Sequence, residues 1–317
     1  MYKFLLALIF WSILLFNNMQ ILGQETKVYL ADFYNNDLKS KIEDSASSFL
    51  SSINTSYNRV DKELILPVEY LESFTKSINT IWEYTPFYFE EEKIIESVTR
   101  LSNGEFQIRN IIANFVDDAG IISYEEVVLN FSKNGMINDF RISIPAQRYK
   151  ELLNSGDDEI DVANREQILT FVENFRTAYN KKDIQFIDNV FSDQALIIVG
   201  RVVENTGITS EFETQVEYLQ FTKTEYVERL KNLFTLNKKI SVQFEDLEII
   251  KHPKYPEIYG VTMTQYYSST LYSDEGYLFL LIDFKDPNEP LIHVRTWQPK
   301  QITSEEEVFN IGFMEIF

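Results

Sequence analysis

Apolar residues recur at helical spacing in two stretches of the chain that also match each other. Ile168, Phe171, Val172, Phe175 and Tyr179 follow the i, i+3, i+4, i+7 and i+11 spacing of one helix face. This spacing predicts a helix over 164–179, and residues 42–57 predict another. When the two are aligned, the identical positions are Phe49 with Phe171, Thr55 with Thr177, Tyr57 with Tyr179, Asn58 with Asn180 and Asp61 with Asp183.

Each of these helices is followed by a second helix and by four strands. The second helices share the runs Glu69-Tyr70-Leu71-Glu72 and Glu225-Tyr226-Val227-Glu228. The first four strands are predicted at 93–101, 105–115, 125–131 and 136–144. Asn103-Gly104 and Asn134-Gly135 lie between them, and Asn-Gly is a strong hairpin signal because both residues tolerate positive φ. The later strands are predicted at 239–251, 257–270, 276–285 and 290–298.

The matches predict two copies of one domain. We expect the first copy at 24–149, a linker at 150–163 and the second copy at 164–317. In the last strand of each copy, Arg141 and Pro145 align with Arg295 and Pro299. If the copies are equivalent, they superpose with one strand order and can form an intramolecular pseudo-dimer. Helices followed by a meander indicate an α+β class in which helices cover one sheet face.

The second copy resembles a known superfamily. Its first helix closes with Tyr179-Asn180-Lys181-Lys182-Asp183, followed by a short helix at 184–190 and an inserted strand at 195–199. This order resembles the nuclear-transport-factor-2-like superfamily, with its SnoaL- and ketosteroid-isomerase-like fold, over 164–299 and more weakly over 36–145. The resemblance implies two tandem cone-like domains, each with helices packed on a curved antiparallel sheet. The first copy lacks the inserted strand and is a degenerate version. The overall plan resembles secreted proteins of Bacteroidetes.

The N-terminus has the pattern of an export signal. Lys3 precedes an apolar run over 4–16, and Gly23 offers a small residue at a cleavage site. We expect cleavage after Gly23 and a periplasmic or secreted location; an uncleaved anchor is the alternative. The chain has no Cys, so neither a lipoprotein anchor nor a disulfide is available. After cleavage, no stable membrane insertion is expected.

Composition narrows the classes of function. An apolar content of 44% and an aromatic content of 15% predict folded cores. A net charge of −20 disfavours nucleic acid and anionic lipid as partners. The two histidines, His252 and His293, are far apart in sequence, and no zinc, nucleotide or hydrolase motif occurs. We interpret the acidic run at 157–161 as a solvated linker. We therefore predict no metal and no cofactor.

The last predicted strand carries the candidate site. Strand alternation places Leu291, His293, Arg295 and Trp297 on one face and Ile292, Val294 and Thr296 on the other. The favoured interpretation is that the first face packs the two domains together. A ligand site or a catalytic site is the alternative for these residues and for their counterpart Arg141. Tyr267 belongs to a group of tyrosines that could line a groove.

Two hypotheses for function remain. The first is a secreted or periplasmic, non-catalytic binding module of the cell envelope, whose partner is a small molecule or an envelope protein. The second is a pocket enzyme of the isomerase or dehydratase type in the second copy. Fold alone does not decide between them. A continuous cavity lined by a buried Asp or His would favour the enzyme.

Overall fold

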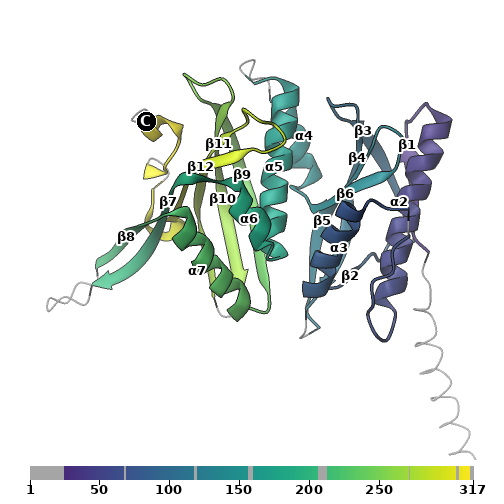
Figure 1. Cartoon of the computed structure of the whole chain (residues 1–317), viewed down its shortest axis with the longest axis horizontal. Helices are drawn as coiled ribbons and strands as arrows, with labels where there is room; N and C mark the ends of the chain where they lie inside the picture. The colour runs from purple at the N-terminus through teal and green to yellow at the C-terminus, as the bar shows by residue number, and fades with distance from the viewer. Residues whose placement is uncertain are drawn as a thin grey trace, which may run out of the picture. The chain divides into compact units, whose positions relative to one another are not determined.

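The computed structural model describes residues 25–67, 69–117, 120–155, 160–205, 213–270, 272–304 and 307–314. The predicted signal peptide at 1–23 lies outside the described residues. The chain divides into two compact units (Figure 1), and the boundary falls between Phe140 and Arg141 by their internal contacts. Both units combine helices with a single sheet, so the chain is of mixed helix and sheet class.

The first unit has two helices and a six-stranded sheet with the order β1-β3-β4-β5-β6, in which β2 pairs with β4. Its elements are β1 (Lys27–Ala31), α2 (Asn36–Tyr57), α3 (Glu72–Tyr84), β2 (Phe87–Tyr88), β3 (Lys93–Arg100), β4 (Phe106–Val116), β5 (Ile122–Phe131) and β6 (Ile137–Ile142). Aromatic rings from α2, β2 and β6 fill its core, where Phe140 lies 5.7 Å from Phe49 and 5.3 Å from Phe87. In both Asn-Gly hairpins only the glycine takes positive φ, 86° at Gly104 and 87° at Gly135.

The edge strand β1 is held by side chains of α2. Ser51, Ser47 and Glu43 accept hydrogen bonds from the backbone N–H groups of Thr26, Val28 and Leu30, at 3.1, 2.9 and 2.7 Å. One helical turn of four residues rises ~6 Å and two strand residues advance ~6.6 Å, so the two ladders stay in register. The free edge of the sheet is thereby occupied.

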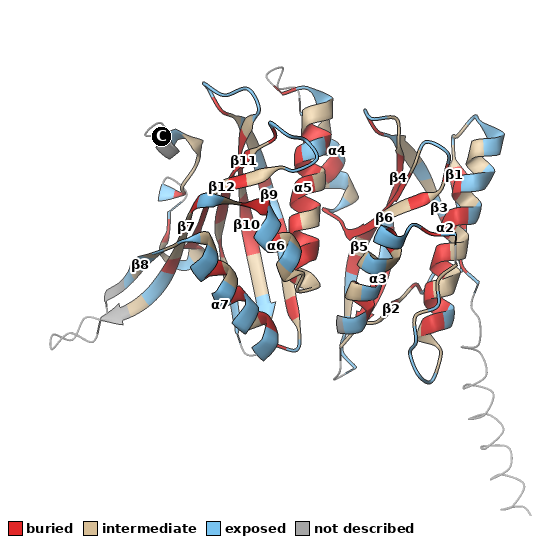
Figure 2. Cartoon of the chain, in the orientation of Figure 1, coloured by how far each residue is buried: buried red, intermediate tan, exposed pale blue. Residues whose placement is uncertain are grey.

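The second unit has a six-stranded sheet with the order β8-β7-β12-β11-β10-β9. Its elements are α4 (Ala146–Leu153), α5 (Val162–Asn180), α6 (Ile184–Val190), β7 (Phe191–Asn205), β8 (Glu213–Phe221), α7 (Lys223–Leu236), β9 (Ile240–Lys251), β10 (Ile258–Ser269), β11 (Ser273–Asp283), β12 (Leu291–Pro299) and the 3-10 turns η1 (Lys300–Ile302) and η3 (Ile311–Met314). Figure 2 shows the buried residues gathered along α5 and the central strands. Residues 309 and 311 pack on the opposite sheet face, against Phe279, Leu281 and Val294.

The second unit begins earlier in the chain than the sequence predicted. Tyr149, Leu152 and Ile160 are buried at 1%, 8% and 3% exposure and belong to its hydrophobic core. The predicted linker at 150–163 is therefore wrong for its described residues, which include the end of α4 and the start of α5. An eight-residue helix such as α4 is too short to show a clear apolar period, which is why the sequence did not reveal it.

The two sheets share the order of their meander but differ at the edges. Strands β3 to β6 and strands β9 to β12 each run in sequential order. In the first unit, β1 pairs in parallel with the first meander strand, β3. In the second unit, β7 pairs in parallel with the last, β12, and β8 extends that edge. The expected identity of strand order therefore holds only for the meander, because each unit recruits its extra strands from a different part of the chain.

Candidate functional site

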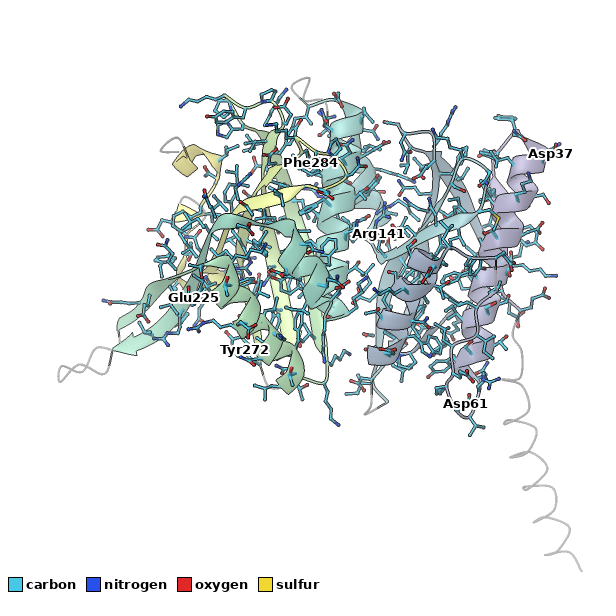
Figure 3. All side chains as sticks on the ribbon, in the orientation of Figure 1. Asp37, Asp61, Arg141, Glu225, Tyr272 and Phe284 are labelled. Atoms are coloured by element: carbon cyan, nitrogen blue, oxygen red, sulfur yellow. The ribbon has the colours of Figure 1, made fainter. Side chains whose placement is uncertain are left out.

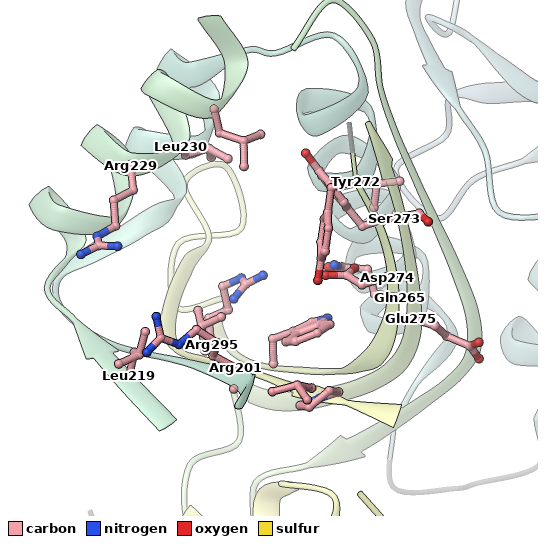
Figure 4. A pocket seen from close by; sticks show the side chains of 18 of the residues that line it. Arg201, Leu219, Arg229, Leu230, Gln265, Tyr272, Ser273, Asp274, Glu275 and Arg295 are labelled. Atoms are coloured by element: carbon pink, nitrogen blue, oxygen red, sulfur yellow. The ribbon is translucent and has the colours of Figure 1, made fainter. Parts of the chain in front are cut away.

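The concave side of the second unit holds a cavity of about 1180 Å³ (Figure 4). Helix α7 and strands β7, β8, β10, β11 and β12 supply most of its wall. The apolar part of that wall includes Val199, Leu219, Phe221, Leu230, Leu233 and Val242. Polar and charged side chains come from α5, β7, α7, β10, β11, β12 and η1, so the cavity has the mixed lining typical of small-molecule sites.

Arg295 is the most buried charge in this lining. The residue is 6% exposed, and its Nε and Nη1 atoms have no hydrogen-bond partner among the described residues. Its guanidinium lies 5.1 Å from the centre of the Tyr226 ring. Burial alone would lower the pKa of Arg295, but Tyr226, Tyr179 and Asp274 together raise it above the ordinary value. The side chain is therefore a permanent cation inside the cavity.

Two phenols lie beside this cation. The hydroxyl groups of Tyr179 on α5 and Tyr226 on α7 share a hydrogen bond of 2.5 Å. Burial raises the pKa of Tyr179 well above its usual range, and the neighbouring Tyr226 adds to the rise. A neutral phenol stabilises a guanidinium through its ring and its oxygen but does not cancel its charge.

Asp274 is the acidic group of the cavity. Burial raises the pKa of its carboxyl above the ordinary value, while a hydrogen bond with Tyr272 and the charge of Arg295 lower it in part. Its Oδ1 atom has no partner among the described residues. Burial, followed by the nearby Asp274, raises the pKa of Tyr272 to about 12. Figure 4 shows Asp274 and Arg295 directed into the hollow, across from Arg229 and Leu230 on α7.

Trp297 forms part of the cavity wall beside Arg295. The indole is 7% exposed, and its Nε1 has no partner among the described residues. A glycine on the neighbouring strand makes room for it, because a Cβ on Gly276 would lie 2.5 Å from Cε2 and Cζ2 of Trp297. Tyr267 lines the same cavity and lies 6.4 Å from the Tyr272 ring. Three of the predicted site residues, Arg295, Trp297 and Tyr267, are thus brought together.

His293 does not share a face with Arg295, contrary to the prediction. The register between β11 and β12 shifts so that Leu281 pairs with Val294 and Ile282 pairs with Ile292, leaving His293 in a β-bulge. A bulge adds one unpaired residue and reverses the alternation beyond it. Ile292 and Trp297 therefore face the core that carries the cavity, and Val294 faces the opposite side. His293 approaches Asp283 instead, at 3.3 Å.

Arg141 also lies away from the cavity. Arg141 is labelled in Figure 3. Its Nε donates to Glu173 Oε2 at 3.0 Å, and both side chains are 1% exposed or less. Glu173 also accepts from the backbone N–H of Ile144 at 2.9 Å. Phe140 packs into the aromatic core of the first unit, so the next residue, Arg141, points to the other sheet face. The predicted equivalence with Arg295 therefore holds in sequence but not in orientation.

Sequence reasoning missed several residues of the cavity. Tyr179 appeared only as a helix-closing residue, and Tyr226 only as part of a matched run. Asp274 falls between the predicted strands at 257–270 and 276–285, although it lies in β11. Among the described residues, no group of three or more His, Cys, Asp or Glu could hold a metal ion. No helix within the described ranges is long and apolar enough to cross a membrane.

No protein-family model matches this chain, and no curated protein matches it either. Several solved structures are similar at low identity. Bd1075 of Bdellovibrio bacteriovorus is 17% identical; the match covers 54% of this chain and 46% of that protein, with a TM-score of 0.33. This chain thus spans less than half the length of that protein.

Two other similar structures are named as a dehydratase and as a nuclear-transport-factor-2-like protein. A putative scytalone dehydratase from Novosphingobium aromaticivorans is 10% identical over 43% of this chain and 83% of that one, with a TM-score of 0.32. A nuclear-transport-factor-2-like protein from Cytophaga hutchinsonii is 15% identical over 43% of this chain and 97% of that one, with a TM-score of 0.30. These likenesses concern the fold only, and the site rests on the chain's own residues.

Proposed function

We propose that the second unit binds a small organic molecule inside its cavity, as part of an exported, non-catalytic binding module. The observation that carries this proposal is the cavity of about 1180 Å³, in which apolar side chains share the wall with polar groups such as Arg295 and Asp274. Such pockets typically measure ~300–1,000 Å³ and bury most of a drug-sized ligand. The cavity is therefore large enough for a ligand of many carbon atoms.

Binding can be tested with Trp297 as the reporter. Trp11 lies in the predicted signal peptide, so a Trp82→Phe variant of the processed chain keeps Trp297 as its single tryptophan. Titration with a library of small apolar molecules should change its fluorescence. Val199→Phe, which fills the cavity, should weaken the hits about tenfold or more. Ile198→Phe is the matched control, because alternate strand residues face opposite sides. The proposal fails if no library member binds or if both variants behave alike.

A second candidate function is catalysis by Asp274. The observation that favours it is a carboxyl group whose pKa is raised by burial and which lies in the cavity beside a fixed cation. A carboxyl with a raised pKa can act as a general acid or base nearer neutral pH. The isomerase or dehydratase alternative places the reaction here. Asp274→Asn should then abolish turnover of a ligand found by the fluorescence screen, whereas binding alone would survive the change.

Export of the chain is also part of the proposal. The charged start, apolar run and small residue over 1–23 support a cleaved signal and a periplasmic or secreted location. Intact-mass analysis of protein from the native host should show a chain beginning at or near Gln24. Full-length protein retained in the cytoplasm would contradict this part of the proposal and leave the binding site unaffected.

A further inference from the structure

We propose that the molecule bound in the second unit's cavity is an organic carboxylate, with its carboxylate group against Arg295 and its apolar body against α7 and the inner strands. This inference rests on the proposed binding function and adds the class of ligand. It follows from the charge of Arg295, the charge balance of the cavity and the distribution of its apolar walls.

Arg295 lacks a carboxylate partner within the described part of the chain. A buried guanidinium normally has a carboxylate partner, because an unpaired buried charge is costly. No carboxylate of the described residues lies within salt-bridge distance of Arg295, and two of its three nitrogens have no hydrogen-bond partner. Its immediate neighbours, Tyr179 and Tyr226, carry phenol groups and no carboxylate. A ligand carboxylate would supply the missing charge.

Arg141 provides an internal comparison. Like Arg295, it is buried, at 1% exposure against 6%, but Glu173 pairs with it at 3.0 Å. The same chain therefore compensates a buried arginine that faces packed protein. Arg295, which faces a cavity, has no carboxylate within salt-bridge distance among the described residues. This contrast indicates that the counter-ion of Arg295 comes from outside the chain.

The second step is the charge balance of the lining. Arg201, Arg229, Arg295 and Lys300 line the cavity, against Asp274 and Glu275 as the acidic members among the described residues. The whole chain has the opposite balance, with 29 basic and 49 acidic residues. Glu275 pairs with Lys300 at 2.6 Å and Glu217 pairs with Arg201 at 2.5 Å, which leaves Arg229 and Arg295 against Asp274. A cavity with local positive charge in an acidic protein attracts anions of low charge.

The third step is the shape of the ligand. Arg295 is a single buried cation, so one negative charge balances it, and a dianionic phosphate would leave an excess. The walls beyond it are mainly aliphatic and aromatic, including Leu230, Leu233 and Phe221. These groups favour an apolar body of considerable size. A hydrophobic carboxylic acid, either aromatic or aliphatic, complements both the Arg295 cation and the apolar walls of the cavity.

Matched ligands test the inference. Biphenyl-4-carboxylate and its carboxamide, and decanoate and its amide, differ in charge but hardly in shape. Affinities for the Trp82→Phe chain are measured at pH 7 by Trp297 fluorescence and calorimetry. We expect each carboxylate to bind at least about tenfold more tightly than its amide. Arg295→Gln should remove this preference while leaving amide binding within about twofold, and Arg295→Lys should restore part of it.

Lys254→Gln is the matched control, because it removes one positive charge from an exposed loop of the same unit. It should leave the preference unchanged. If an amide binds as well as its carboxylate, the ligand class is wrong and the binding function stands. If no member of either pair binds although other library members do, the carboxylate class is contradicted and the binding function stands; if no library member binds either, both are contradicted. The comparison of ligands on the unmodified site decides the matter even if Arg295→Gln does not fold.

Discussion

Two arginines at matched positions of the chain have opposite surroundings. Arg141 and Arg295 both lie in the last strand of a meander, and both are almost fully buried. The bulge at His293 turns Arg295 toward the cavity, whereas Arg141 in β6 follows the core residue Phe140 and turns toward Glu173. One extra residue in a strand therefore separates a structural ion pair from a candidate ligand contact.

The Arg141–Glu173 pair should be costly to break from one side. Glu173→Gln leaves Arg141 buried without a formal counter-charge, and such single losses destabilise proteins by ~3–5 kcal/mol. The double variant Arg141→Met with Glu173→Gln should be more stable than the sum of the single changes predicts, because it removes both charges. Urea unfolding of the four chains measures the coupling. Additive costs would show that the pair contributes no specific interaction.

Asp274 should reduce stability at neutral pH. Burial raises the pKa of its carboxyl in the folded chain above the unfolded value, and the rise already includes the attraction to Arg295. The folded state therefore favours the protonated form. The stability that the Asp274 carboxyl contributes is fully present below its pKa in the unfolded chain. This stability is lost as pH rises through its pKa in the folded chain.

Asp274→Asn removes this titration while keeping an oxygen that can accept from Tyr272. The variant should have a higher melting temperature than the parent chain at pH 7, and the difference should shrink toward pH 3.5. Glu257→Gln, on the turn before β10, serves as a surface control. A variant that is less stable than the parent at pH 7 and unchanged in acid would contradict the prediction.

At the scale of elements, long periodic segments were predictable and short or irregular ones were not. The sequence located α5, α7, α6 and both meanders within a few residues, because these elements carry apolar periods or Asn-Gly turns. It missed β1, α4 and β8, which are five to nine residues long. It also missed the bulge in β12, because a strand with a bulge and a strand without one have apolar patterns that differ by only one residue. This last error displaced His293 and hid the cavity.

The ladder between α2 and β1 should protect the sheet edge. Ser47→Ala removes the acceptor for the Val28 N–H group, and a lost hydrogen bond of this kind costs ~0.5–1.5 kcal/mol. Hydrogen exchange at the Val28 amide should become faster, and Ser47→Ala with Ser51→Ala should have a larger effect. Ser52→Ala is the matched control, because Ser52 bonds to the carbonyl of Ser48 within α2. Equal exchange rates in all variants would mean that the ladder does not hold the edge.

At the scale of the whole molecule, the sequence predicted two units but misplaced their boundary. The similarity between copies lies in the helices and meanders, so the residues that join them carried no matching pattern. The structure assigns 141–163 to the second unit through packing that is distant in sequence: Arg141 with Glu173, Arg148 with the Leu247 carbonyl, and Tyr149 in the core. Contacts between residues this distant in sequence produce no periodic pattern of apolar residues.

This boundary leads to a prediction about fragments. Residues 141–317 contain a complete core, so this fragment should fold alone and keep the cavity. A fragment of 164–317 lacks Tyr149, Leu152 and Ile160, which are large buried side chains, and it leaves Glu173 without Arg141. Loss of even one such side chain costs ~2–5 kcal/mol, which approaches the total stability of many domains.

The shorter fragment should therefore be unfolded or aggregated by circular dichroism and size exclusion, while the longer one unfolds cooperatively. If 164–317 were as stable as 141–317, the segment 141–163 would be a linker after all, and the boundary at Phe140 would be wrong.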